Sequence, residues 1–217
     1  MEIMSTGEEG RAARGGRSRA GVSPTRERIM DAAETHLAKG GYLGVSLEEV
    51  ARDVGVSKPA LYYHFPEGKE EIFVAVAHRA LEQHGEGLQR AISSAGDGAS
   101  RLRAIARWLM SERARDHPVG ELRNVGNFMN EQHRAELATA FFGSLFAPIH
   151  GVISSAVESG EFKDNSVEFL TWAFLSLLSG MVEVEEMPSG SPAQDTIRSS
   201  ETKVDTIVDL FLTGVLR

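Results

Sequence analysis

The stretch from Ser46 to Phe65, SLEEVARDVGVSKPALYYHF, constrains the fold of this chain more than any other segment. Its pattern predicts two short helices joined by a tight turn. Ser46 and Glu49 have the spacing of a capping box, in which each residue satisfies an otherwise unpaired N–H group at the helix start. Gly55 follows the apolar positions of the first helix, and a glycine there favours the left-handed residue that commonly ends a helix.

The second predicted helix runs from Lys58 to about His64. Ser57 can cap this helix, and Pro59 fits its first turn, where a missing N–H group costs nothing. Leu61 is its inward anchor. The donors that it exposes are Lys58, Tyr62, Tyr63 and His64. Two helices joined in this way are typical of a helix-turn-helix that binds DNA. Short helical hairpins are also common connections, so the spacing by itself leaves both interpretations open.

The residues on either side of this motif favour the DNA-binding interpretation. TRERIMDAAETHLAKGGYLGVS precedes it and PEGKEEIF follows it, and the whole pattern resembles the TetR family of bacterial transcriptional regulators. The resemblance covers about residues 24 to 72, and Val45 is one departure, since the family often has a hydroxyl residue there. The matching residues are Arg28, Ile29, Ala32, Ala33, Gly41, Tyr42, Ser46, Val50, Ala51, Gly55, Val56, Ser57, Leu61, Tyr62, His64, Phe65, Lys69 and Ile72.

The resemblance implies a fold, a function and a set of DNA contacts. It implies an all-α chain, in which a three-helix DNA-binding domain precedes a helical domain for ligand binding and dimerisation. It also implies a sequence-specific regulator, more often a repressor, that binds double-stranded operator DNA as a homodimer and is released by an unknown small-molecule effector. Ser46 and Lys69 are expected at phosphates, and Pro59 and Ala60 at base edges. The full set expected at the DNA is Ser46, Ser57, Lys58, Pro59, Ala60, Tyr62, Tyr63, His64 and Lys69.

The distribution of charge agrees with DNA binding by the N-terminal part. The chain has 217 residues and a net charge of −8, which is unfavourable for a protein that approaches phosphates. Residues 11–69, however, carry ten Lys or Arg against seven Asp or Glu, whereas residues 70–217 carry thirteen against twenty-one. The positive charge therefore lies with the helix-turn-helix, where phosphates need it.

The pattern of apolar residues predicts about nine helices in all and no strands. We expect a DNA-binding domain at residues 23–68, whose first helix begins after Ser23 and ends at Gly40-Gly41, and an effector-binding and dimerisation domain at residues 69–217. Residues 1–22 form an Arg- and Gly-rich arm that is expected to be disordered when free. The arginines of this arm could follow DNA phosphates, or the arm could simply be solvated.

Two functional regions are expected in the C-terminal domain. Aromatic residues of its middle helices fit an apolar ligand pocket, although plain core packing explains any one of them more readily. The last two long helices, at about 167–186 and 200–216, are expected to form a four-helix interface between two copies of the chain, with Phe211 inside it. The candidate ligand-binding residues are Trp108, Phe128, His133, Phe141, Phe142 and Phe174.

Other classes of function have little support in the sequence. The chain has no cysteine, its seven histidines lack the spacing of metal ligands, and no catalytic or phosphate-binding motif occurs. We therefore expect no metal, no cofactor and no enzymatic activity. No apolar run approaches the roughly 20 residues that span a bilayer, so we expect a cytoplasmic protein. The alternatives are a ligand-binding or protein-interaction module without operator recognition and, less favoured, an enzyme that uses the helical pocket.

Overall fold

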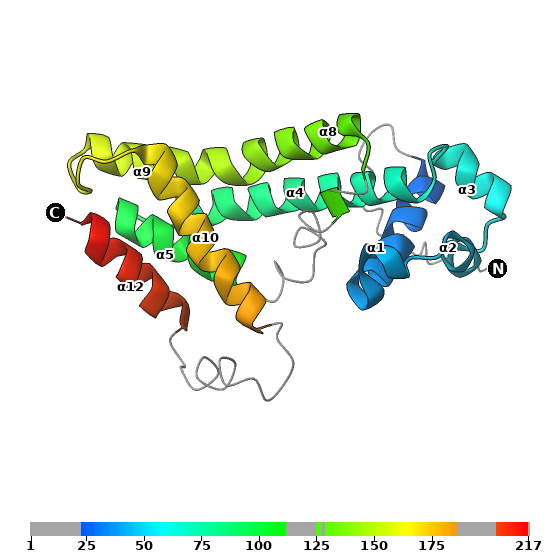
Figure 1. Cartoon of the computed structure of the whole chain (residues 1–217), viewed down its shortest axis with the longest axis horizontal. Coiled ribbons are helices and arrows are strands. Elements are labelled where there is room, and N and C mark those ends of the chain that lie inside the picture. The colour runs from blue at the N-terminus through cyan, green and yellow to red at the C-terminus, as the bar shows by residue number, and fades with distance from the viewer. Residues whose placement is uncertain (1–22, 112–124, 127–128, 186–202, 217) are drawn as a thin grey trace, which may run out of the picture.

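The computed structural model describes residues 23–111, 125–126, 129–185 and 203–216. Within these residues the regular elements are helices, and one isolated bridge joins Phe162 to Leu216, so the predicted all-α class is confirmed. Figure 1 shows a small lobe of three helices at one end and a larger group of helices at the other, with one long helix running through both. The arm at residues 1–22, the helix expected near 119–125 and Phe128 lie wholly or mostly outside the described residues.

The small lobe consists of α1 (Pro24–Gly44), α2 (Leu47–Val54) and α3 (Lys58–His64). Gly41 has a positive φ of 59°, which interrupts α1 where the sequence predicted its end. Ser23 stands at the N-cap position of α1 but its hydroxyl makes no capping hydrogen bond. Pro24 supplies the start of this helix instead, because its fixed φ suits the first helical position.

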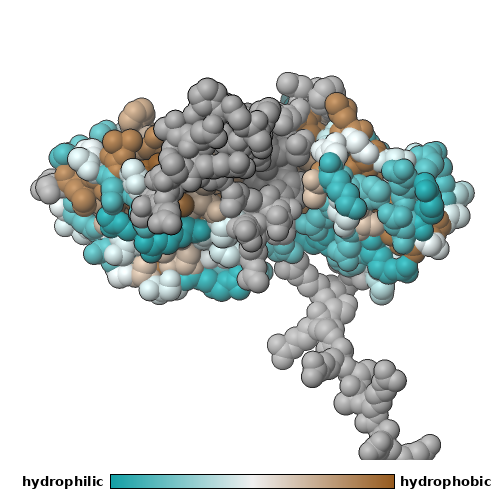
Figure 2. All heavy atoms as spheres, turned by 90° about the horizontal axis from the view of Figure 1, so that it is seen from below, coloured by the Kyte–Doolittle hydropathy of each residue, from teal (hydrophilic) through white to brown (hydrophobic). Residues whose placement is uncertain are grey.

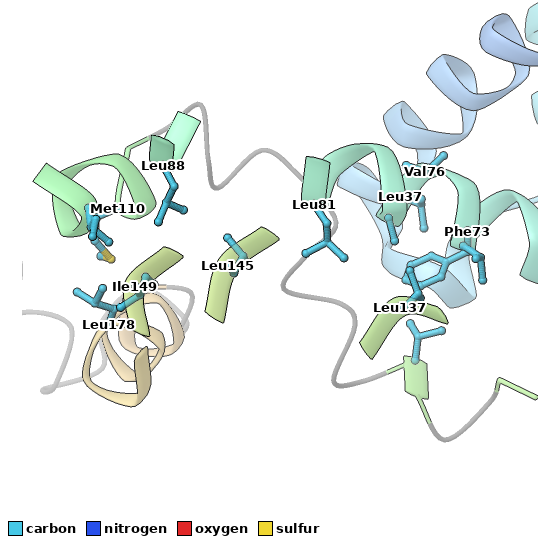
Figure 3. Packing of buried hydrophobic residues seen from close by; sticks show 14 of the residues in the cluster. Leu37, Phe73, Val76, Leu81, Leu88, Met110, Leu137, Leu145, Ile149 and Leu178 are labelled. Carbon is cyan, nitrogen blue, oxygen red and sulfur yellow. The ribbon is translucent and has the colours of Figure 1, made fainter. Parts of the chain in front are cut away.

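The long helix α4 (Lys69–Ser93) carries the core of both parts of the molecule. Ile72, Phe73 and Val76 on its first turns are at most 1% exposed, and the ring of Tyr42 meets that of Phe73 edge-on at 5.2 Å. Figure 3 shows Phe73 and Val76 beside Leu37 of α1 at one end of this core, and Leu88 near Met110 at the other.

The helices of the C-terminal part pack on α4 and on one another. They are α5 (Gly98–Leu109), α8 (Glu131–Phe141), η3 (Phe142–Phe146), α9 (Ala147–Glu158), α10 (Val167–Glu185) and α12 (Lys203–Val215). Asp97 caps α5, since its carboxylate accepts the N–H of Ser100 at 2.7 Å. In Figure 1, α8 and α9 run alongside α4, and α12 lies at the end of the molecule farthest from α3.

Segments α8, η3 and α9 form one continuous helix that contains a π-helical turn. The turn ends just before Pro148, which cannot donate a backbone hydrogen bond, so a local change in the hydrogen-bond pattern accommodates the proline. This 28-residue helix, Glu131–Glu158, is long and apolar enough in one window to cross a membrane by length and composition. The sequence expectation that no such run exists is therefore wrong for this window. Leu145, Ile149 and Ile153 pack into the protein core.

A buried guanidinium fastens the small lobe to α4. The side chain of Arg79 is 13% exposed, and its two terminal nitrogens lie 3.0 Å from Glu27 Oε2, 2.7 Å from Asp31 Oδ1 and 2.7 Å from Glu34 Oε2. All three carboxylates belong to α1. Arg79 therefore binds three successive carboxylates of α1 from the middle of α4. This contact lies further along α4 than the apolar residues that pack with the lobe.

Replacing Arg79 by Met should lower the free energy of unfolding by about 1–3 kcal/mol, because three carboxylates lose a partly buried hydrogen-bond donor. Arg107→Met is the matched control, since Arg107 makes an exposed ion pair with Asp205 at 2.8 Å. That change should cost less than about 1 kcal/mol. Urea unfolding of both variants measures the difference. If both variants lose the same free energy of unfolding, Arg79 stabilises the protein no more than an exposed ion pair does.

Candidate nucleic-acid interface and effector region

The two helices of the predicted motif form with the expected turn and serine caps, but among the described residues the Glu49 half of the predicted capping box does not form. The hydroxyl of Ser46 accepts the N–H of Glu49 at 3.4 Å, and that of Ser57 accepts the N–H of Ala60 at 3.3 Å. The Glu49 carboxylate lies 4.0 Å from Nδ1 of His36 on α1. Gly55 ends α2 in the left-handed region, with φ 74° and ψ 34°. These contacts fix the angle between α2 and α3.

The buried side of this motif anchors α3 against the lobe. Leu61 and Val50 are 0% exposed, and Phe65, at the end of α3, is also fully buried with the Arg26 guanidinium 4.5 Å from its ring centre. The Arg28 guanidinium donates to the carbonyl of Val54 at the end of α2. Because its inner face is held in this way, α3 presents its outer face as a rigid surface.

The outer face of α3 carries the residues that the sequence placed at DNA. Tyr63 is 82% exposed and Tyr62 is 40% exposed, with the Tyr62 ring packed over Gly68. Lys58 and Pro59 are exposed, whereas Ala60 and His64 are half-buried. In Figure 1 this helix lies at the outer end of the small lobe, away from the C-terminal helices. Lys58, Pro59, Tyr62 and Tyr63 are therefore the expected DNA contacts of α3 that solvent reaches most freely.

Lys58 already has a partner in the protein, which the sequence analysis missed. Its ammonium group forms an ion pair with the carboxylate of Glu48 on α2. This hydrogen bond lowers the pKa of Glu48 and raises that of Lys58. Both side chains are more than half exposed, so a phosphate that approaches Lys58 can compete with Glu48 for the ammonium group.

Lys69 lies at the junction between the small lobe and α4. Its ammonium group donates to the carbonyl of Leu43 at 3.2 Å and lies 4.8 Å from the ring centre of Tyr42. Burial lowers the pKa of Lys69. Lys69 thus supports the segment that leads into α2, in addition to its predicted role at a phosphate.

The candidate ligand-binding residues do not gather in one place. His133 lies at the start of α8 and contacts Glu70 of α4. Phe174 is 1% exposed, and its ring centre lies 5.2 Å from that of Phe211. Phe141 and Phe142 both lie near Trp172, with ring centres at 6.4 Å and 6.0 Å from it. Phe128 is outside the described residues. Trp108, the remaining candidate, lies on α5.

Trp108 packs against the later turns of α4. A Cβ atom on Gly87 would lie 2.0 Å from the Trp108 ring, so the glycine makes room for the indole. Among the described residues, the indole N–H is buried and has no hydrogen-bond acceptor. The Arg90 guanidinium is 6.0 Å from the ring centre. A buried donor of this kind can bind the acceptor of a ligand.

A cleft of about 520 Å³ opens on the other side of α4, where that helix crosses η3. Its lining includes Gly85, Ser144, Pro148, Glu82 and Glu86, and none of the six candidate residues. A Cβ on Gly85 would come within 3.2 Å of Ser144, so the two helices approach closely here. The cleft is a surface hollow beside this close crossing.

The fold and the outer face of α3 together define a helix-turn-helix protein, in which the long helix α4 follows the motif and packs against it. Comparison with known proteins agrees. Residues 29–76 match the model of bacterial regulatory proteins of the tetR family. The transcriptional activator FasR of Mycolicibacterium smegmatis is 36% identical over 93 residues, which cover 42% of this chain and 42% of FasR. The match with this relative thus spans less than half of its length.

Solved structures share the fold over most of the chain. AibR in complex with isovaleryl coenzyme A and operator DNA has a TM-score of 0.65 at 18% identity, covering 87% of this chain and 97% of that one. A transcriptional regulator from Saccharomonospora viridis in complex with choline has a TM-score of 0.72 at 19% identity, covering 88% and 97%. The N-terminal part of this chain, at residues 29–76, thus matches the tetR family of bacterial regulatory proteins.

Replacing Gly87 by Ala should displace the Trp108 ring and lower the free energy of unfolding by about 1–3 kcal/mol, because the added methyl group overlaps the indole. Gly151→Ala in α9 is the control, since a Cβ at that position meets no atom within 4 Å. Urea unfolding gives the stability, and indole fluorescence in a Trp172→Phe background reports the Trp108 ring. Unchanged stability and fluorescence in Gly87→Ala would contradict the packing described here.

Proposed function

We propose that this protein is a transcriptional regulator that binds operator DNA as a homodimer and leaves it when a small-molecule effector binds to the C-terminal helices. The observation that carries the proposal is the exposed outer face of α3, which presents Lys58 and Tyr63 on a rigid support. A helix of this kind can enter the major groove while α2 rests on the backbone. The match of residues 29–76 to the tetR family model supports the same function.

The dimer is proposed from the apolar surface of the last helices. Phe169 on α10 is 65% exposed and Leu210 on α12 is 67% exposed, which is unfavourable for a chain alone in water. Figure 2 shows hydrophobic surface over the end formed by the C-terminal helices, whereas the lobe of α1–α3 is mainly hydrophilic. Phe211, which the sequence analysis placed in the interface, is 7% exposed and belongs to the core of its own protomer.

The effector site is proposed beside Trp108, where a buried indole donor faces no acceptor among the described residues. AibR and the Saccharomonospora viridis regulator are both complexed with small molecules, which supports a small-molecule effector here. A ligand at this position would press on the later turns of α4, and α4 continues directly into the small lobe. The effector would then favour an arrangement of the two lobes that fits DNA poorly.

We propose that the chain acts in the cytoplasm, where its DNA lies, and has no catalytic role. Repression is the simplest outcome, because a protein bound over a promoter blocks access to it. FasR is named an activator, so the position of the operator relative to the promoter would decide the direction of regulation.

Lys58→Ala should weaken binding to duplex DNA from upstream of the gene and reduce the slope of log affinity against log salt by about 0.9, since one phosphate contact is lost. Lys163→Ala is the matched control, because Lys163 is an exposed lysine in the α9–α10 connection, far from α3. Fluorescence anisotropy at several salt concentrations measures both variants. The assignment of Lys58 fails if the two lysine variants have the same slope as the wild type.

Phe169→Glu should convert the dimer into a soluble monomer, because it places a charge in the apolar contact between α10 helices. Leu43→Glu is the control, since Leu43 is a similarly exposed apolar residue at 76% but lies in the small lobe. Light scattering gives the mass of each variant. A fully dimeric Phe169→Glu would exclude this face of α10 from the interface.

A further inference from the structure

A group of polar side chains joins the start of α8 to the first turn of α4. Nδ1 of His133 lies 2.8 Å from Oε1 of Glu70, and the same carboxylate oxygen accepts the backbone N–H of Asn130 at 2.8 Å. The side chain of Asn130 caps α8 by accepting the N–H of His133 at 2.9 Å. We call Glu70, Asn130 and His133 the α4–α8 clasp.

The clasp lies at the edge of the protein, where His133 is buried and Asn130 is exposed. His133 is 7% exposed, and the Glu70 side chain is 24% exposed. Nε2 of His133 also lies 3.6 Å from the carboxylate of Glu67, in the connection between α3 and α4, so the imidazole faces two acidic groups. The hydrogen bonds from Asn130 and His133 lower the pKa of Glu70, which keeps this carboxylate ionised. Directional hydrogen bonds to a charged group hold one geometry between the two helices.

The clasp lies directly beside the support of the DNA-binding lobe. Glu70 follows Lys69, which holds the carbonyl of Leu43 ahead of α2. Glu67 belongs to the turn that leaves α3, and its backbone N–H donates to Glu71 at 3.0 Å. A shift of the first turn of α8 would therefore act on residues next to both helices of the motif.

We propose that the α4–α8 clasp is the contact through which the C-terminal helices set the position of the DNA-binding lobe, with His133 as a positioning residue. The inference rests on the proposed function as a DNA-binding regulator. In the arrangement that binds DNA, the clasp is closed. In the arrangement that leaves DNA, α8 shifts and the hydrogen bonds to Glu70 open. Because coupling between two sites is reciprocal, DNA bound at α3 must in turn stabilise the closed clasp.

Hydrogen exchange of the full chain, with and without duplex DNA from upstream of its gene, tests this coupling without knowledge of the effector. In the wild type, DNA should slow exchange in α3 and should also slow exchange at residues 129–137 by about fivefold or more. In Glu70→Ala, DNA should still slow exchange in α3, but residues 129–137 should no longer respond. A purely structural role of Glu70 would change exchange equally with and without DNA.

Two further variants separate the loss of the Glu70 contacts from the loss of a negative charge. Glu131→Ala removes an exposed acid from the same turn of α8 and should respond as the wild type does. Glu70→Gln retains an amide oxygen that can accept the N–H of Asn130 and should restore part of the response. The inference is overturned if residues 129–137 respond to DNA equally in Glu70→Ala and the wild type, or do not respond in the wild type although α3 does. Absence of any effect on α3 in the wild type would instead refute the proposed DNA binding, and the inference with it.

Discussion

The apolar face of α4 is the contact on which the rest of the structure depends. The three helices of the small lobe span few residues, and a unit of this size buries too little surface to be stable by itself. Ile72, Phe73 and Val76 complete its core, and Ala80, Leu81 and Leu88 of the same helix complete the core of the C-terminal part. Neither part can therefore move freely with respect to α4.

This sharing has a consequence for regulation. A helix that belongs to two cores transmits a tilt imposed at one end to the other, because packed interiors resist gradual deformation. Two polar contacts add fixed points of attachment along α4. Arg79 binds α1 at the middle of α4, and His133 binds Glu70 at its beginning. The structure thus has a polar connection at Arg79 and a second one at Glu70, and we propose that the second one opens when the protein leaves DNA.

Local features of the DNA-binding lobe were predictable from the sequence, because short-range chemistry decides them. Gly55 adopts the left-handed region that its position required, and Ser57 caps α3 as expected. The apolar spacing of residues 69–92 correctly indicated one long helix. The exposed surface of α3 followed from the same patterns, since Leu61 fixes which side of that helix faces inward.

Contacts between residues far apart in the chain could not be predicted in this way. Nothing near His133 in sequence indicates that Glu70 lies beside it, so the histidine was assigned to a ligand pocket on residue type alone. Phe211 was placed in the dimer interface because an apolar stripe does not reveal which of its residues face the protomer's own core. The pairing of Lys58 with Glu48 was missed for a related reason, because it depends on the angle between α2 and α3.

In the proposed dimer, two copies of α3 read one DNA site. Selection of bound duplexes from a random pool, with the full chain, measures whether they do. We expect enrichment of an inverted repeat whose half-sites are about 10 base pairs apart, centre to centre, or a multiple of that spacing. Recovery of duplexes with no shared sequence, or of a site without two-fold symmetry, would contradict it.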